Sequence, residues 1–150
     1  MPLQFPTRIL VALDGSEASR HALTTACELC RATGSELHLV YVATNSPAVR
    51  GRPLTPAQRE AAEQEGEQVL EAGRTQAVGE DVEVAQCHLR SGGSIDQSLQ
   101  QAQEELDAGL LVVGAHRSGK VAGKLITGTG GAGVVRRAAA SILVVRPPTP

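Results

Sequence analysis

The chain has very few aromatic residues: among its 150 residues there is no Trp, one Phe (Phe5) and one Tyr (Tyr41). Base-stacking platforms, aromatic cages and aromatic-rich protein interfaces all need several exposed rings, so this scarcity excludes them. A hydrophobic core must therefore consist of Leu, Val, Ile and Ala. Any planar ligand must be held mainly by aliphatic side chains and backbone hydrogen bonds, with Tyr41 as the only ring expected near the site.

Other shortages exclude further classes of protein. Fourteen Lys and Arg against sixteen Asp and Glu give a net charge of −2, so there is no basic surface for nucleic acid. The cysteines, Cys27, Cys30 and Cys87, are too few for a secreted disulfide scaffold. No apolar run approaches the roughly twenty residues that span a bilayer, and the first residues lack the apolar core of a signal peptide. We expect a cytoplasmic, soluble protein with reduced thiols and no membrane partner.

Hydrophobic periodicity predicts one domain over residues 1–150, built from alternating strands and helices. Strands are predicted at residues 8–13, 35–42, 82–89, 110–114 and 142–146. Helices are predicted from Ser16 to the stop at Gly34, from 56 to about 78, from 94 to about 108, and in a short segment that ends at 138. A flexible loop is predicted at about 43–55, and a turn is predicted at 90–94. This alternation indicates an α/β three-layer sandwich, a parallel sheet with helices on both faces.

Two features of the sequence lie at the carboxyl ends of predicted strands. Asp14 follows the first strand and Gly114 ends the fourth. Parallel sheets bind ligands beyond the carboxyl ends of their strands, where the strand order reverses. The Asp14 carboxylate is suited to accept hydrogen bonds from a base amino group or ribose hydroxyls. The alternative role is local, as an Asx turn or a helix N-cap.

Glycine is concentrated after the fourth strand. Seven of the sixteen glycines lie within residues 114–133. Without Cβ atoms, backbone N–H groups can turn toward an anion, and a following helix N-terminus adds partial positive charge. Thr129 offers a hydroxyl, and four side chains offer positive charge: His116, Arg117, Lys120 and Lys124. The pattern predicts a phosphate-binding loop; the alternative is a surface loop whose glycines only permit turns.

Two other motifs are near matches. Gly114, Gly119 and Lys120 have the spacing of a Walker A loop, but Val121 occupies the position where Ser or Thr would hold magnesium. This disfavours a P-loop NTPase. Cys27-x-x-Cys30 has redox spacing, but it lies inside a predicted helix and not at its N-terminus. We therefore predict two packed core cysteines, and with no second Cys/His pair we predict no zinc site.

Several segments together resemble the universal stress protein family. They are ILVALDGSEASR at 9–20, LHLVYV at 37–42, LLVVG at 110–114, Gly128-Thr129, VVRRA at 134–138 and ILVVRP at 142–147. The likeness extends over essentially the whole chain in the correct order. It implies an adenine nucleotide alpha hydrolase-like fold with five parallel strands in the order 3-2-1-4-5. It also implies a homodimer that forms through the edge of the fifth strand.

The ATP-binding branch of that family carries the motif G-x2-G-x9-G-[S/T]. By matching position, the resemblance implies that Asp14 and Val42 hold the adenosine of ATP. Its phosphates, with Mg, would lie on the glycine loop. The loop residues implied are Gly114, Gly128 and Thr129, with Gly119 and Gly130 as further contacts. This chain departs from the motif: Arg117 replaces the second glycine, the interval to Gly128 is one residue longer, and three glycines follow Thr129 within four residues.

These observations support two hypotheses about function. The first is a stress-response or signalling protein that binds ATP or a related adenine nucleotide. Hydrolysis would be slow at most, because no general base or second acidic metal ligand is evident near the loop. The second is a dimeric interaction or signalling protein of the same fold that binds no nucleotide, which Arg117 favours.

Overall fold

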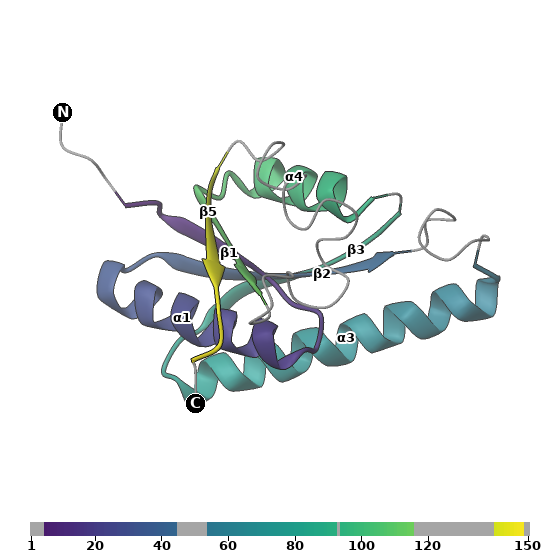
Figure 1. The fold of residues 1–150 in the computed structure, drawn as a ribbon, viewed down its shortest axis with the longest axis horizontal. Coiled ribbons are helices and arrows are strands. Elements are labelled where there is room, and N and C mark those ends of the chain that lie inside the picture. The colour runs from purple at the N-terminus through teal and green to yellow at the C-terminus, as the bar shows by residue number, and fades with distance from the viewer. Residues whose placement is uncertain (1–4, 45–53, 93, 116–139, 149–150) are drawn as a thin grey trace.

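The computed structural model describes residues 5–44, 54–92, 94–115 and 140–148 of the chain (Figure 1). Five strands and three helices lie within these residues. The strands are β1 (Arg8–Ala12), β2 (Glu36–Thr44), β3 (Val84–Gly92), β4 (Leu110–Gly114) and β5 (Ser141–Val145). The helices are α1 (Glu17–Thr33), α3 (Pro56–Gly79) and α4 (Ile95–Leu106).

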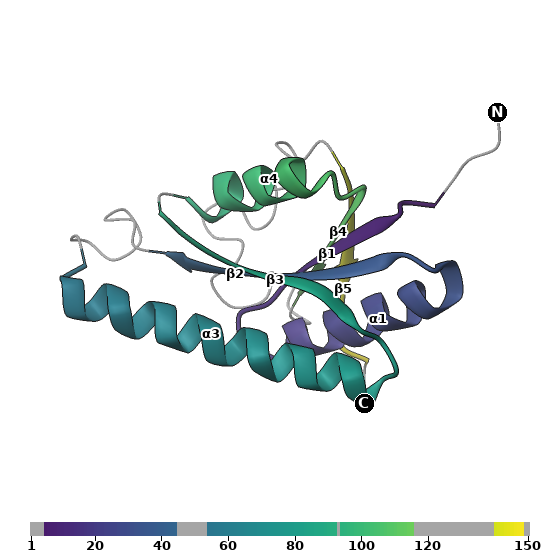
Figure 2. The ribbon, with the colours of Figure 1, turned by 180° about the vertical axis from the view of Figure 1, so that it is seen from behind.

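All five strands are parallel and lie in the order β3-β2-β1-β4-β5. Helices α1 and α3 cover one face of the sheet, and α4 lies on the opposite face (Figures 1 and 2). The α/β three-layer sandwich and the strand order predicted from the sequence are therefore confirmed. In such a sheet the strand order reverses at β1 and β4, so the carboxyl ends of these two strands form the switch point where ligands bind.

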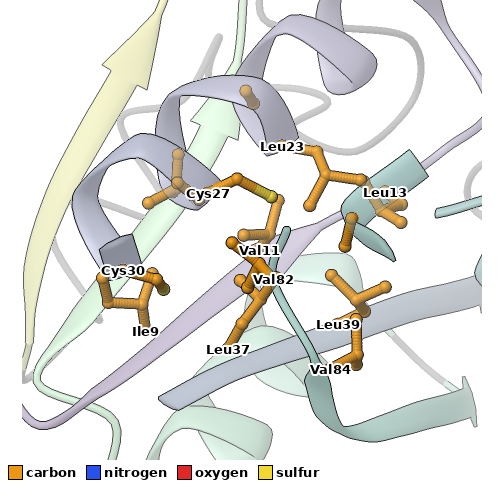
Figure 3. Close-up of a cluster of buried hydrophobic side chains, with 14 of the residues drawn as sticks. Ile9, Val11, Leu13, Leu23, Cys27, Cys30, Leu37, Leu39, Val82 and Val84 are labelled. Carbon is orange, nitrogen blue, oxygen red and sulfur yellow. The ribbon is translucent and has the colours of Figure 1, made fainter. Parts of the chain in front are cut away.

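The core has two halves, one on each face of the sheet. Alternate residues of the central strands point to opposite faces. Ile9 and Val11 of β1, and Leu13 just after it, pack toward α1 and α3, while Leu10 and Ala12 pack toward α4. Figure 3 shows the first half, in which Cys27 and Cys30 of α1 lie among aliphatic side chains of the sheet. The predicted aliphatic core and the predicted burial of both cysteines are confirmed.

Helix α1 begins and ends at the residues that the sequence indicates. The Ser16 hydroxyl accepts a hydrogen bond from the Ser19 N–H at 3.1 Å, which satisfies one of the free donors of the first turn. Gly34 ends the helix in the left-handed conformation, with φ of 77°, and donates its N–H to the Cys30 carbonyl at 2.8 Å. Because Ser16 caps the first turn of α1, the loop of residues 14–16 is held beside the carboxyl end of β1.

The boundaries of β2 and β3 differ from the predicted ones. β2 continues to Thr44, and β3 begins at Val84 and continues to Gly92, because Ala43 pairs with Ser91 and Thr44 pairs with Gly92. Residues 90–92 are thus strand and not turn, since pairing with β2 satisfies their backbone groups. Val82 instead donates its N–H to the Ala77 carbonyl at the end of α3. Most of the predicted loop (45–53) and the segment 116–139 lie outside the described residues.

Candidate functional site

The strand register brings the predicted residues of β1, β2 and β4 to one edge of the sheet. Ala12 pairs with Val40, and the Leu13 N–H donates to the Val40 carbonyl at 2.9 Å. Continued by two residues, this register places Asp14 beside Val42. On the other side Val11 pairs with Val112, so Gly114 also lies at this edge. The sheet thus brings together Asp14, Val42 and Gly114, as the sequence predicts.

Asp14 has both a local role and an unused oxygen. Its Oδ1 accepts a hydrogen bond from the Ser16 N–H at 2.9 Å, an Asx turn, while Ser16 itself is the N-cap of α1. Its Oδ2 is buried and has no hydrogen-bond partner among the residues that the structure describes. A buried polar atom without a partner costs about 1–3 kcal/mol, and more when it is charged. The Oδ2 atom is therefore suited to accept a hydrogen bond from a ligand.

Val42 and Tyr41 lie on opposite faces of β2. Val42 is 6% exposed and belongs to the core half under α4, together with Ala12 of β1. Tyr41 points to α3, where a Cβ on Gly66 would approach its Cδ1 to 2.5 Å. The expectation that Tyr41 lies near the site is wrong, because successive side chains of a strand alternate between faces. The apolar surface at this edge is aliphatic.

Gly114 is required by packing, whether or not a ligand is bound. A Cβ at this position would lie 2.3 Å from the carbonyl oxygen of Ala18 and 2.5 Å from its carbon. These are backbone atoms of the first turn of α1, so they cannot move aside as a flexible side chain can. The absence of a side chain lets the end of β4 pass against α1. The sequence shows the glycine but not this reason for it.

The glycine-loop residues remain sequence predictions. Gly119, Gly128, Thr129 and Gly130 lie outside the described residues, and so does Arg117. Within the described ranges, no three His, Cys, Asp or Glu side chains are placed to hold a metal ion. Nor does any helix in these ranges have the length and apolar character needed to cross a membrane.

A cleft of about 250 Å³ separates α1 from α3 on the other face of the sheet. Leu13, Leu23 and Val69 contribute apolar lining, and Arg20 and Gln76 contribute polar groups. Gln76 donates to the Arg20 carbonyl and to the Thr24 hydroxyl, both at 3.0 Å, so its amide is already engaged across the two helices. No motif in the sequence predicts this cleft, because the residues that line it come from α1, α3 and the segment after β1.

Solved structures with the same fold cover nearly the whole chain. A universal stress family protein from Burkholderia pseudomallei is 26% identical, with a TM-score of 0.68 over 93% of this chain and 95% of that one. A universal stress protein from Archaeoglobus fulgidus in complex with dAMP is 15% identical, with a TM-score of 0.66 over 95% and 98%. A universal stress family protein from Arabidopsis thaliana with AMP bound is 17% identical, with a TM-score of 0.63 over 96% and 94%.

Comparison with curated protein sequences gives no match. The model of the universal stress protein family, in contrast, matches residues 6–146, which include every described strand and helix. The chain belongs to the universal stress protein family.

Proposed function

We propose that this chain binds ATP or a related adenine nucleotide at the carboxyl ends of β1 and β4, in a stress-response or signalling role. The observation that carries the proposal is the Asp14 carboxylate, whose Oδ2 is buried at this edge without a partner among the described residues. Ribose hydroxyls and the adenine amino group are hydrogen-bond donors that such an oxygen accepts. The structures with AMP and dAMP, which share the fold, support a nucleotide as the ligand.

Each predicted residue has a role in this proposal. Val42 and its aliphatic neighbours supply apolar contact for the base, since the one Tyr ring lies on the opposite face. Backbone N–H groups of the glycine-rich loop bind the phosphates. We assign these phosphate contacts to Gly114, Gly119, Gly128 and Gly130, with the hydroxyl of Thr129 as a further donor. Mg would enter with the phosphates of ATP.

Replacement of Asp14 with Asn tests the proposal without removing the turn. An amide oxygen can still accept from the Ser16 N–H, while an NH₂ group takes the place of Oδ2. A ligand donor would then face another donor. Loss of a hydrogen bond to a charged group costs about 1.5–3 kcal/mol, so we expect the Kd for ATP in calorimetry to rise roughly ten- to hundredfold.

Asp81→Asn is the matched control. Asp81 is exposed, precedes β3 at the opposite end of the sheet and has φ of 61°, a conformation that Asn tolerates. Its substitution should leave the Kd unchanged. No binding of ATP, AMP or cAMP to the wild-type protein, with or without Mg, would contradict the proposal. Equal Kd values for wild type and Asp14→Asn would show that the site lies elsewhere.

The edge strand β5 favours a second candidate, a dimeric interaction or signalling protein of the same fold. β5 lies at the edge of the sheet, and its Val144 is 39% exposed. An apolar edge strand without charged residues is a template for pairing with another chain. We propose that two copies pair through β5, with or without nucleotide.

Light scattering after gel filtration tests this pairing. We expect a homodimer for the wild-type protein and a monomer for Val144→Lys, because a buried Lys charge opposes the apolar contact. Val78→Lys is the control: Val78 is 63% exposed on α3, so its substitution should leave the dimer intact. A monomeric wild-type protein would exclude the pairing through β5, and a dimer in both variants would place the contact elsewhere.

A further inference from the structure

Two histidines meet on neighbouring strands, His38 in the amino-terminal half of β2 and His88 in the middle of β3. His38 of β2 is 4% exposed, and His88 of β3 is half-buried. The Nδ1 atom of His38 lies 3.3 Å from the Nε2 atom of His88, with ring centroids 5.6 Å apart and planes inclined by 20°. The pair thus joins the edge strand β3 to β2 on the face that α4 covers.

Charged groups from every neighbouring element surround the pair. On β2, Glu36 Oε1 lies 3.3 Å from His38 Nε2, and its Oε2 lies 3.9 Å from Arg8 Nε of β1. Arg8 also donates to the Leu106 carbonyl at the end of α4, at 3.0 Å. Arg90 of β3 pairs with Glu105 of α4. The histidines therefore lie within a chain of contacts that ties β1, β2, β3 and α4 together.

The geometry limits how many protons the pair can hold. With both rings neutral, His38 Nε2–H donates to Glu36, and His38 Nδ1 accepts from His88 Nε2–H. One added proton is accommodated, since His38 Nδ1–H then donates to His88 Nε2. A second proton places two N–H groups and two positive charges face to face across 3.3 Å. The hydrogen bond is then lost and the rings repel each other.

We propose that His38 and His88 form an acid-sensitive latch, which holds β3 and the end of α4 against the sheet and opens when both rings are protonated. A cleft of about 410 Å³ lies beside His38 and is lined by Arg8, Glu36, Gln86, Glu105 and Leu106. Opening loosens the pairing of β2 with β3 around the two histidines, on the face that α4 covers.

The electrostatic surroundings of His88 also disfavour its protonated form in the folded protein. Burial lowers the pKa of His88 below its ordinary value of 6.5; His38 and Arg90 lower it further, and Glu105 opposes them in part. The unfolded chain therefore binds more protons than the folded one at pH values between the lowered pKa and 6.5. This contribution to stability is complete above that range and is lost as the pH falls through it.

Urea unfolding at about pH 7.5 and about pH 5 tests the latch. If unfolding takes up one proton, the unfolding constant of the wild type should rise by up to about tenfold for each unit by which the pH falls. In His88→Gln the amide still donates to His38 Nδ1 but takes up no proton, so this part of the acid dependence should disappear. His21→Gln is the control, because His21 lies on α1 beside Glu17, away from the pair.

Equal acid dependence of wild type and His88→Gln would overturn the proposal. A second measurement needs no variant: NMR titration of the imidazoles in the wild-type protein. Coupled rings should titrate in two separate steps, the lower of them below pH 6.5. Faster hydrogen exchange of the β3 amides, after correction for the intrinsic rate, should accompany the lower step. Independent titration of both rings near the ordinary value would exclude the latch.

Discussion

Neighbouring residues at the strand ends of this protein serve opposite faces of the sheet. Leu13 closes the core under α1 and α3, and the next residue, Asp14, leaves a carboxylate oxygen unused at the sheet edge. Tyr41 packs against α3, whereas Val42 belongs to the other face. A slip of one residue would exchange these roles, because side chains alternate with a period of two. The strand register therefore decides which side chains can contact a ligand.

At the same scale, the three thiols are expected to differ in reactivity. Burial, together with the nearby Glu80 carboxylate, raises the pKa of Cys27 to about 12, and burial raises the pKa of Cys30 to about 11. Cys87 is half-buried and accepts a hydrogen bond from Arg74. Near pH 8, Ellman's reagent should modify Cys87 in the native protein and reach the other two only after unfolding, because only thiolates react.

Cys87→Ser should abolish the fast reaction, and rapid modification of Cys27 or Cys30 in that variant would contradict their burial.

Stability should also depend on pH in the alkaline range. In the unfolded chain Cys27 and Cys30 have the ordinary thiol pKa of 9.0. In the folded chain their pKa values are about 12 and about 11. Stability is therefore expected to fall as the pH rises above about 9.

At the scale of elements, α3 approaches the sheet through two glycines seven residues apart. Its buried residues are Gly66, Leu70, Gly73 and Ala77, while most of its first ten residues are exposed. A Cβ at Gly66 would meet Tyr41 Cδ1 at 2.5 Å and Leu89 Cδ1 at 2.6 Å. The helix can lie close to β2 and β3 because these positions lack side chains.

Gly66→Ala and Gly79→Ala therefore have opposite expected effects within one helix. Alanine favours a helix over glycine by about 1 kcal/mol. At Gly79 nothing lies within 4 Å of a new Cβ, so the free energy of unfolding should rise by up to that amount. At Gly66 overpacking costs about 1–3 kcal/mol, and the free energy should fall. Urea unfolding measures both, and a stabilised Gly66→Ala would show that Tyr41 moves aside at little cost.

At the scale of the whole molecule, two aliphatic clusters hold the three layers together. Leu39 in the middle of β2 is fully buried, and it packs with residues of α1, α3 and the neighbouring strands. With almost no rings available, the core depends on many Leu, Val, Ile and Ala contacts, each of modest size. Among the described residues, Tyr41 is the only aromatic residue that packs against this core.

Leu39→Ala should consequently destabilise the whole fold. Removal of a fully buried Leu side chain costs about 2–5 kcal/mol, a large share of the roughly 5–15 kcal/mol that stabilises a typical domain. Val78→Ala removes an exposed side chain on α3 and should change the free energy of unfolding by less than about 0.5 kcal/mol. Similar urea midpoints for the two variants would contradict the packing seen around Leu39.

Local patterns predicted much of this structure because their causes are local. The Ser16 cap, the Gly34 stop and the apolar runs of β1 and β4 each specify an element within a few residues. The ends of β2 and β3 were predicted less well. Arg90–Gly92 reads as a turn in sequence, yet it forms a strand because Val42–Thr44 lie beside it. Strand length thus depends on a partner distant in sequence.

The sequence by itself determined the fold class, the order of elements and the presence of Asp14, Val42 and Gly114 near the carboxyl ends of strands. Only the tertiary structure decided what these residues contact. It leaves Asp14 Oδ2 buried without a described partner, turns the Tyr41 ring to α3 and packs Gly114 on the backbone of Ala18. It also joins His38 to His88 across fifty residues. Composition and periodicity specify elements, but contacts between distant segments depend on how the sheet and helices pack in three dimensions.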